Sequence, residues 1–529
     1  MAEPTSGSAG RGRFGPASWF GLVCLVTYAY FLPAPASNEI SRFNLVRAVV
    51  EHGRLEVDPF AETTADIAQH GGHVYSDKAP GASFLAVPAY AVYLAVLNAK
   101  GAPGPAFTRE SLMRKLAPGA EDRLFLSPAF RLGVYVCNLF TNVVAGAALA
   151  TLLLWLLLGW GVGQARALFA AVAFAWGSQN FAYSVMFFGH VLAALGLFGG
   201  FVLLERAETA RFRDPARAVG ATTVMAVAAG FFVGLAVLVE LPAALGAAVL
   251  VGYAATAPAS QSGASPRVRR VLAFVAGMVP GLAALLIYQA AVFGSPFSPG
   301  YAHVTDPTFA AGMSQGLLGV GAPRPEALWG MFFGRQRGLF YLAPVLLLSL
   351  VGMGQGLAVA KTRRPAVVAA AVLGAFVLMN AGYYMWWGGA ALGPRHLVPA
   401  MPFVALGFAW LRPPANPAWH RPLTALAMAL LVVSVVNVMA AVAVSPLVPW
   451  GQDTLADHVY PNLWAGRVAL YPGSSNVGMM LGLKGITSLV PLLLIAGLGM
   501  WLVVTELRAR AGAVRATGGG GIGGTRIPN

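Results

Sequence analysis

The 529-residue chain contains few charged residues and almost no cysteine. Only 10% of its residues are charged, whereas a typical soluble domain carries roughly 25%, and 57% are apolar. The two cysteines, Cys24 and Cys137, both lie within apolar runs. They predict neither a disulfide framework nor a metal site. The scarcity of charge excludes a soluble globular protein and favours a chain that is largely embedded in a lipid bilayer.

Long apolar runs recur from Ser18 almost to the C-terminus. A hydrocarbon core about 30 Å thick requires roughly 20 apolar residues for each helical crossing. The first run lacks a convincing cleavage site and is followed by further spans, so we interpret it as a retained helix. The sequence therefore predicts an all-α polytopic membrane protein with about 12 transmembrane helices. Their expected positions are 18–34, 130–157, 167–184, 189–204, 218–238, 241–257, 271–292, 340–357, 365–383, 397–411, 422–444 and 485–504.

The net charge of +15 is distributed unevenly between the two sets of connecting segments. If the N-terminus lies inside, almost all of this charge falls on the inner segments, which is the positive-inside pattern. The pattern predicts cytoplasmic N- and C-termini and an even number of spans. Because topology explains the charge and no soluble basic domain exists to bind nucleic acid, we expect no nucleic-acid partner. Frequent Arg, Ala and Gly favour a bacterial inner membrane.

Four predicted outer segments are too long to be simple turns, and long loops of this kind tend to be functional. They are 35–129, 293–339, 384–396 and 445–484. The expected organisation is an N-terminal cytoplasmic segment 1–17, a transmembrane module 18–292 that contains the first outer loop, a second module 293–507 that contains the other three, and a Gly-rich disordered cytoplasmic tail 508–529.

The apolar segment 81–99 within the first outer loop needs a separate interpretation. It is bracketed by Lys78 and Lys100 and contains Pro88. If it crossed the membrane, every later loop would change sides and the basic clusters would lie outside. We therefore expect it to lie in the plane of the membrane interface.

The stretch just after the first predicted helix reads SNEISRFNLVRAVVEHGRLEVD. Glu39 and Arg42 lie three residues apart and therefore share one face of a helix. A carboxylate beside an arginine at the membrane surface should stay ionised at neutral pH, so it could act as a base. The alternative is a structural one, in which Ser37 or Asn38 starts the helix and Glu39 favours its positive end.

A second motif, VYSDKAPGASFL, places Asp77 and Lys78 in a turn bounded by Gly and Pro. A lysine at the headgroup level is suited to contact a phosphate. The alternative is a lysine that only extends its ammonium group to water. We expect Glu39 and Lys78 to converge on one cavity that opens to the outer leaflet.

An acid directly after the first helix, a nearby arginine, and an acid-Lys-x-Pro turn before an apolar helix resemble motifs of the GT-C glycosyltransferases. The likeness is to the bacterial aminoarabinose transferases and the protein O-mannosyltransferases, and it covers roughly residues 18–140. The resemblance implies a long first periplasmic loop with interfacial helices. It also implies inverting transfer of a sugar from a polyprenyl-phosphate donor to a glycan, lipid or protein acceptor.

The resemblance also implies roles for single residues. Glu39 is similar to the catalytic carboxylate and Asp77 to the acid beside the lysine, while Arg42 and Lys78 resemble residues near the donor phosphate. The chain departs from the aminoarabinose pattern because Asn38 stands where that pattern has its first acid. We predict no structural metal, and a divalent ion at Glu39 stays an open alternative.

Further polar and aromatic residues are expected at the outer ends of later spans. GRQRGLFYLAP and YYMWWGGAALGPRHLVPAMPF contain Arg337 and Arg395, which are candidates for holding the donor phosphate. Trp387 supplies either part of an interfacial aromatic belt or a flat face for a sugar or prenyl chain. Additional candidate site residues are His190, Glu240 and Tyr301.

Two other functions fit the same number of spans. A transporter or flippase of a lipid-linked or small solute usually has polar and broken-helix features near mid-membrane, whereas here charge gathers in the outer loops. The third interpretation is an inactive scaffold in envelope assembly. The favoured interpretation is a membrane glycosyltransferase whose partners are the bilayer, a lipid-linked sugar donor and an acceptor.

Overall fold

The computed structural model describes residues 15–110, 123–213, 218–256 and 264–516. Within this part, eight helices are long and apolar enough to cross a membrane, and four shorter apolar helices accompany them. The long ones are α3, the continuous α4–α5 stretch, α8, α9, α11, α16, α19 and α22, and the shorter ones are α1, α6, α10 and α15. The prediction of an all-α polytopic membrane protein is confirmed.

The helices are α1 (Pro16–Ala29), α2 (Ser37–His52), α3 (Gly81–Ala99), α4 (Pro128–Asn138), α5 (Val144–Gly159), α6 (Gln164–Ala175), α7 (Asn180–Ser184), α8 (His190–Arg213), α9 (Ala218–Val239), α10 (Ala243–Ala255), α11 (Ala264–Phe293), α12 (Pro307–Met313), α13 (Pro325–Phe332), α14 (Leu339–Leu342), α15 (Leu346–Ala358), α16 (Ala360–Gly382), α17 (Met401–Ala405), α18 (Gly407–Trp410), α19 (His420–Val444), α20 (Tyr460–Trp464), α21 (Val477–Met480) and α22 (Val490–Ala516). The strands form two-stranded antiparallel pairs, which are β1 (Phe31–Leu32) with β6 (Ser475–Asn476), β2 (Ile67–His70) with β3 (His73–Ser76), and β4 (Phe107–Glu110) with β5 (Arg123–Leu126).

Three expected spans are wrong as single helices. The segment 167–184 is divided into α6 and α7, and the segment 340–357 into α14 and α15. The segment 397–411 is divided among a one-turn segment at Arg395–Ala400 and the short helices α17 and α18. Pro399 and Pro402 each lack a backbone N–H and clash with the preceding turn, so they disfavour a regular helix across this segment. The segment lies in the core of the bundle, where Phe403, Leu406 and Phe408 are fully buried.

Two other expectations concern the segment 81–99 and the end of the last helix. The segment 81–99 forms α3, whose length and hydropathy suit a crossing, and its placement in the interface plane stays a prediction. Helix α22 extends to Ala516, beyond the expected start of the tail at 508. The rest of that tail and residues 1–14 lie outside the described residues.

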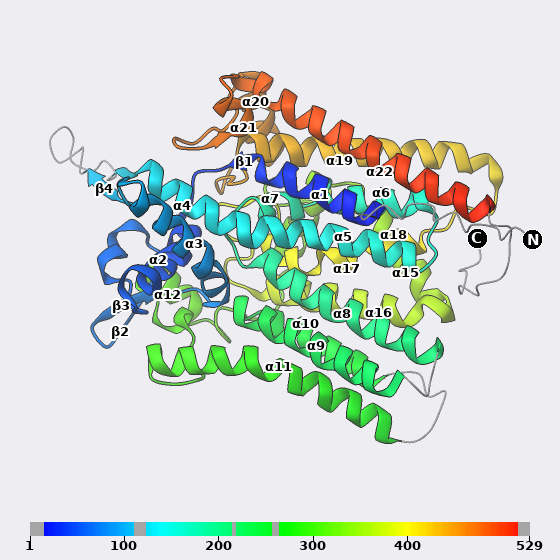
Figure 1. Ribbon diagram of the computed structural model, residues 1–529, viewed down its shortest axis with the longest axis horizontal. Coiled ribbons are helices and arrows are strands. Elements are labelled where there is room, and N and C mark those ends of the chain that lie inside the picture. Colours follow the sequence, from blue (N-terminus) through cyan, green and yellow to red (C-terminus); the bar gives the residue numbers. More distant parts are fainter. Residues whose placement is uncertain (1–14, 111–122, 214–217, 257–263, 517–529) are drawn as a thin grey trace, which may run out of the picture.

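The four long segments that the sequence predicts outside the membrane, called the outer segments below, meet at one end of the bundle. Figure 1 shows α2, α3, β2, β3 and α12 gathered at the left end, whereas α1 begins and α22 ends at the opposite end. Backbone contacts link each of these segments to the next one along the sequence. They pair Ala68 with Val304, Val320 with Tyr383, and Ala391 with Val448. The loops that the sequence placed on one side of the membrane thus form one continuous structure.

Candidate active site

A cavity of about 650 Å³ lies where the outer segments meet the ends of the helices. Its walls come from α2, the region around the β2–β3 hairpin, the start of α8, the turn between α9 and α10 with the start of α10, segment 301–320, α16 and segment 383–396. The polar residues that line it are Asn38, Arg42, Asp66, Asp77, Lys78, His190, Glu240, Tyr301, Tyr383, Tyr384, Arg395 and His396. The larger apolar ones are Leu241, Leu245, Phe309, Met313, Leu317, Leu318, Val320, Leu378, Met379 and Met385.

Two aspartates stand at the open end of the β2–β3 hairpin. Asp66 directly precedes β2 and Asp77 directly follows β3, so the antiparallel pairing of the two strands brings these residues together. At the closed end, Gly71 and Gly72 have φ angles of 59° and 87°. A two-residue hairpin turn often requires such left-handed conformations, which glycine adopts without strain.

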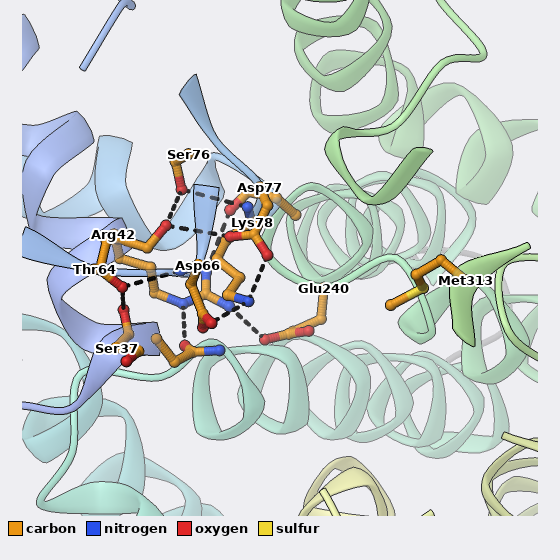
Figure 2. A network of polar contacts seen from close by, with 12 residues as sticks. Ser37, Arg42, Thr64, Asp66, Ser76, Asp77, Lys78, Glu240 and Met313 are labelled. Atoms are coloured by element: carbon orange, nitrogen blue, oxygen red, sulfur yellow. Dashed lines mark hydrogen bonds and ion pairs between the residues drawn. The ribbon is translucent and has the colours of Figure 1, made fainter. Parts of the chain in front are cut away.

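The ammonium group of Lys78 lies between these two carboxylates, as Figure 2 shows. Its Nζ is 2.7 Å from Asp77 and 2.9 Å from Asp66. Burial lowers the pKa of Lys78, but the two carboxylates outweigh burial and raise the pKa above its ordinary value. Burial raises the pKa of Asp77, and Asp66 acts in the same direction while Lys78 opposes it. Lys78 is therefore a permanent cation of the cavity wall.

Arg42 is held by three partners. Its Nη2 lies 2.8 Å from Oε1 of Glu240, its Nε donates to Oδ1 of Asn38 at 3.1 Å, and its Nη1 donates to the carbonyl of Ala79 at 3.2 Å. Nδ1 of His190 lies 3.6 Å from the same oxygen of Glu240. The charge of Arg42 is thus already neutralised by Glu240 within the wall.

Arg395 differs from the other cations of the cavity. Within the described ranges its guanidinium has no hydrogen-bond or ion-pair partner, and its Nε is buried. The group lies 5.8 Å from the ring centre of Phe188. Beside it, Nε2 of His396 is also buried and has no partner in that part of the chain. A partly buried cation without a counter-charge favours the binding of an anion at this position.

Glu39 does not belong to the residues that line the cavity. Its Oε2 accepts a hydrogen bond from the backbone N–H of Ala36, and its Oε1 accepts one from that of Phe187, both at 2.9 Å. The side chain is 2% exposed, and burial raises its pKa to about 7 although the two hydrogen bonds oppose this shift. The expected convergence of Glu39 and Lys78 is not observed. Glu39 instead lies in the first turn of α2 and connects it to the segment before α8, while Asn38 faces the cavity.

Arg337 also lies outside the cavity lining. It is 1% exposed and donates to four backbone carbonyls, those of Gln336, Trp387, Gly389 and Val448. Burial lowers its pKa to about 10. Trp387 stacks on Trp450 with ring centres 4.8 Å apart, and it does not line the cavity either. Arg337 therefore fastens segment 384–396 to segment 445–484.

The carboxylates of the cavity are poorly suited to a divalent cation. Lys78 already lies between Asp66 and Asp77, and an ammonium group repels a second cation. Glu39 uses both of its oxygens for backbone N–H groups. Within the described ranges, no group of three or more His, Cys, Asp and Glu residues is arranged to hold a metal ion.

The chain resembles two structures of an archaeal oligosaccharyltransferase and one of ArnT. The Archaeoglobus fulgidus oligosaccharyltransferase tethered to an acceptor peptide is 11% identical, with a TM-score of 0.44, and the match covers 79% of this chain and 55% of that one. AglB of the same organism, in complex with an inhibitory peptide and dolichol-phosphate, is 11% identical with a TM-score of 0.49, and the match covers 83% and 56%. ArnT from Cupriavidus metallidurans in the apo state is 15% identical with a TM-score of 0.46, and the match covers 92% and 75%.

The chain spans little more than half the length of the two oligosaccharyltransferase chains. Searches against protein-family models and against curated protein sequences found no match.

Seven of the ten residues singled out in the sequence line the cavity. They are Arg42, Asp77, Lys78, His190, Glu240, Tyr301 and Arg395, whereas Glu39, Arg337 and Trp387 do not line it. Sequence reasoning missed Asp66 and His396. Asp66 could have been found from the sequence. Gly71 and Gly72 between two short β-prone runs predict a hairpin, and the ends of a hairpin, here Asp66 and Asp77, lie close together.

Proposed function

We propose that the chain is a GT-C-type membrane glycosyltransferase that moves a sugar from a polyprenyl-phosphate donor to an acceptor on the periplasmic face of a bacterial inner membrane. The observation that carries this proposal is the unpaired guanidinium of Arg395 in a cavity that also has an apolar wall. A polyprenyl-phosphate sugar has the two matching parts, a phosphate anion and a hydrocarbon chain.

The apolar wall gives the hydrocarbon chain a way to the bilayer. Leu245 of α10 and Leu378 of α16 both line the cavity, yet they are 37% and 58% exposed. Both belong to apolar helices of the bundle, so their exposed faces are suited to contact lipid. We infer that the cavity opens sideways at Leu245 and Leu378, near the start of α10 and the end of α16, and that the prenyl chain passes through this opening.

The cations of the cavity are suited to the charge that develops during transfer. The bond from the sugar to the phosphate oxygen breaks with its electron pair, so the phosphate changes from a monoanion to a dianion. In the described part of the chain, no ion pair neutralises the positive charge of Arg395, and Lys78 lies in the same cavity. Preorganised donors of this kind stabilise the transition state more than the ground state. Attack by the acceptor from the opposite side of the sugar inverts the anomeric carbon.

The experiment is a transfer assay with the full chain in lipid nanodiscs. The substrates are radiolabelled polyprenyl phosphates that carry mannose, glucose, arabinose or aminoarabinose, and the product is labelled sugar separated from polyprenyl phosphate. We expect one donor to be consumed, and Arg395→Met to lower kcat/KM by roughly 10²–10³. Arg54→Met is the matched control, since Arg54 is an exposed cation of the same outer region.

The same assay distinguishes the alternative. A flippase or transporter would move the labelled lipid across the membrane of a proteoliposome and leave the bond between sugar and phosphate intact. Transbilayer movement without a free or transferred sugar would reject the transferase proposal. Equal turnover by Arg395→Met and Arg54→Met would reject the assignment of Arg395.

A further inference from the structure

Three carboxylates line the cavity, and their surroundings differ in a way that matters for proton transfer. They belong to Asp66, Asp77 and Glu240, whose side chains are 14%, 4% and 8% exposed. A general base must reach the proton that it removes, and it must be able to lose its negative charge without leaving a buried cation unpaired. These two requirements separate the three groups.

Glu240 fails the second requirement. Its Oε1 is the ionic partner of Arg42, whose guanidinium side chain is 1% exposed. The other partners of Arg42 are the neutral side chain of Asn38 and a backbone carbonyl. A proton on Glu240 would therefore leave the charge of Arg42 buried without a counter-charge, which is strongly unfavourable.

Asp77 fails the first requirement. Its Oδ1 accepts a hydrogen bond from Ser41 at 3.2 Å, and its Oδ2 accepts one from Lys78 at 2.7 Å. Both oxygens are thus occupied, and the residue as a whole is 3% exposed. Asp77 is suited to hold Lys78 in place.

Asp66 meets both requirements. Its Oδ2 lies 2.9 Å from Nζ of Lys78, while its Oδ1 has no partner in the described part of the chain. Its backbone is fixed by Thr64, whose hydroxyl accepts from the N–H of Asp66 at 3.1 Å and donates to the carbonyl of Ser37 at 3.0 Å. Figure 2 shows this chain of contacts from Ser37 through Thr64 and Asp66 to Lys78. If Asp66 takes up a proton, Lys78 keeps Asp77 as its partner.

We propose that Asp66 is the catalytic base of the transfer reaction, and that the acceptor is consequently a hydroxyl group. This inference rests on the proposed glycosyltransferase function. The acceptor oxygen forms a bond to the anomeric carbon, the bond from that carbon to the phosphate oxygen breaks, and the electron pair stays on the phosphate. The proton of the acceptor hydroxyl moves to Oδ1 of Asp66.

The position of Lys78 connects the two halves of this step. Before transfer, Lys78 is shared between Asp66 and Asp77. When Asp66 becomes neutral, Lys78 loses one of its two anionic partners at the moment when the leaving phosphate gains a negative charge. The ammonium group is then freer to interact with the phosphate, so proton removal and phosphate departure assist each other.

The chemistry of the base restricts the class of acceptor. A neutral hydroxyl becomes a strong nucleophile only as its proton leaves, so it needs a base. An acceptor that is already an anion, such as a phosphate group, has no proton to give up and would gain nothing from Asp66. A carboxylate close to the reacting centre would also repel such an acceptor.

The test compares two nucleophiles with the full chain in nanodiscs and the donor that wild type consumes. Water is a hydroxylic acceptor and releases free sugar, whereas azide is an anion and forms a glycosyl azide without proton transfer. We expect Asp66→Ala to lower sugar release by roughly 10²–10⁴. Formation of glycosyl azide should stay at the wild-type rate or exceed it.

Asp66→Asn, which keeps the size of the side chain, should show the same split between water and azide if Asp66→Ala does not fold. Glu62→Gln is the matched control, because Glu62 is an exposed carboxylate of the same loop, and it should behave like wild type with both nucleophiles. The inference is overturned if the Asp66 variants release sugar within about threefold of wild type, or if they lose the reaction with azide to the same extent as the reaction with water. If wild type itself yields no sugar product with either nucleophile, the proposed function fails and this inference fails with it.

Discussion

Arg42 and Glu240 form a buried ion pair that joins the first outer segment to the turn between α9 and α10. Nη2 of Arg42 lies 2.8 Å from Oε1 of Glu240, and their side chains are 1% and 8% exposed. The two residues are separated by 198 positions in the sequence. Because Arg42 also binds the carbonyl of Ala79, the pair holds three separate parts of the cavity wall together.

Removal of one partner of this pair should strongly destabilise the protein. Glu240→Ala leaves the Arg42 cation buried without a counter-charge, so we expect the free energy of unfolding to fall by about 3–5 kcal/mol. The measurement is the unfolding transition in detergent. The control is Glu326→Ala, because Glu326 forms an exposed pair with Arg324 at 3.7 Å and should contribute less than about 1 kcal/mol. Equal shifts in the two variants would contradict the prediction.

The carboxyl group of Glu39 should make stability depend on pH. Burial raises its pKa from 4.5 to about 7 in the folded state, so the folded protein binds a proton that the unfolded chain has already lost. The free energy of unfolding should therefore fall as pH rises from 4.5 through 7, by roughly 3 kcal/mol in all, and change little from this cause above about pH 8.

The test of this pH dependence compares wild type with Glu39→Gln. The variant cannot ionise at this position, so unfolding measured at pH 5 and pH 7.5 should give a smaller difference than in wild type. Its sugar transfer should fall only in proportion to the folded fraction. A loss of turnover by a folded Glu39→Gln protein would restore Glu39 as a catalytic candidate.

We predict that Arg337 stabilises the two segments that it connects and does not contact the donor. Lysine cannot reproduce its contacts with four carbonyl groups, so Arg337→Lys should leave several buried carbonyls without a donor. An unsatisfied buried group costs about 1–3 kcal/mol, and we expect faster proteolysis within 384–396 and 445–484. Arg335→Lys, at an exposed neighbouring position, should have no such effect. A raised KM for the donor without any change in stability would indicate phosphate contact instead.

The sequence was sufficient for the coarse architecture because hydropathy and charge act locally. Each apolar run predicts a helix wherever it lies, and the basic clusters separate the two ends of the bundle. The interruption at 397–411, one of three among the expected spans, has a local cause as well. Pro399 and Pro402 interrupt the helix, but a hydropathy window averages over them and records only an apolar segment.

The candidate site was only partly predictable because it is assembled from distant segments. The pair of Arg42 and Glu240 is a tertiary contact, and no local pattern specifies it. Glu39 was favoured because its position after the first helix matched a motif. The motif gives the order of residues along the chain, whereas the direction of each side chain depends on the turn of α2, which places Asn38 toward the cavity and Glu39 against Phe187.

The sideways opening inferred at the start of α10 and the end of α16 predicts that the length of the prenyl chain will matter. Leu245 and Leu378 line the cavity and are also exposed on these helices, so they form two sides of the inferred passage. Leu378→Trp adds a bulky ring to the passage and should raise the KM for a long undecaprenyl donor by roughly tenfold or more, which corresponds to about 1.4 kcal/mol. A donor with only two or three isoprene units should be used almost normally, because its chain ends before it reaches the opening. The matched control is Leu494→Trp, since Leu494 is 67% exposed on α22 and is not part of the cavity lining. If Leu378→Trp slowed both donors equally, the chain would leave by another route, and the apolar wall would need a different explanation.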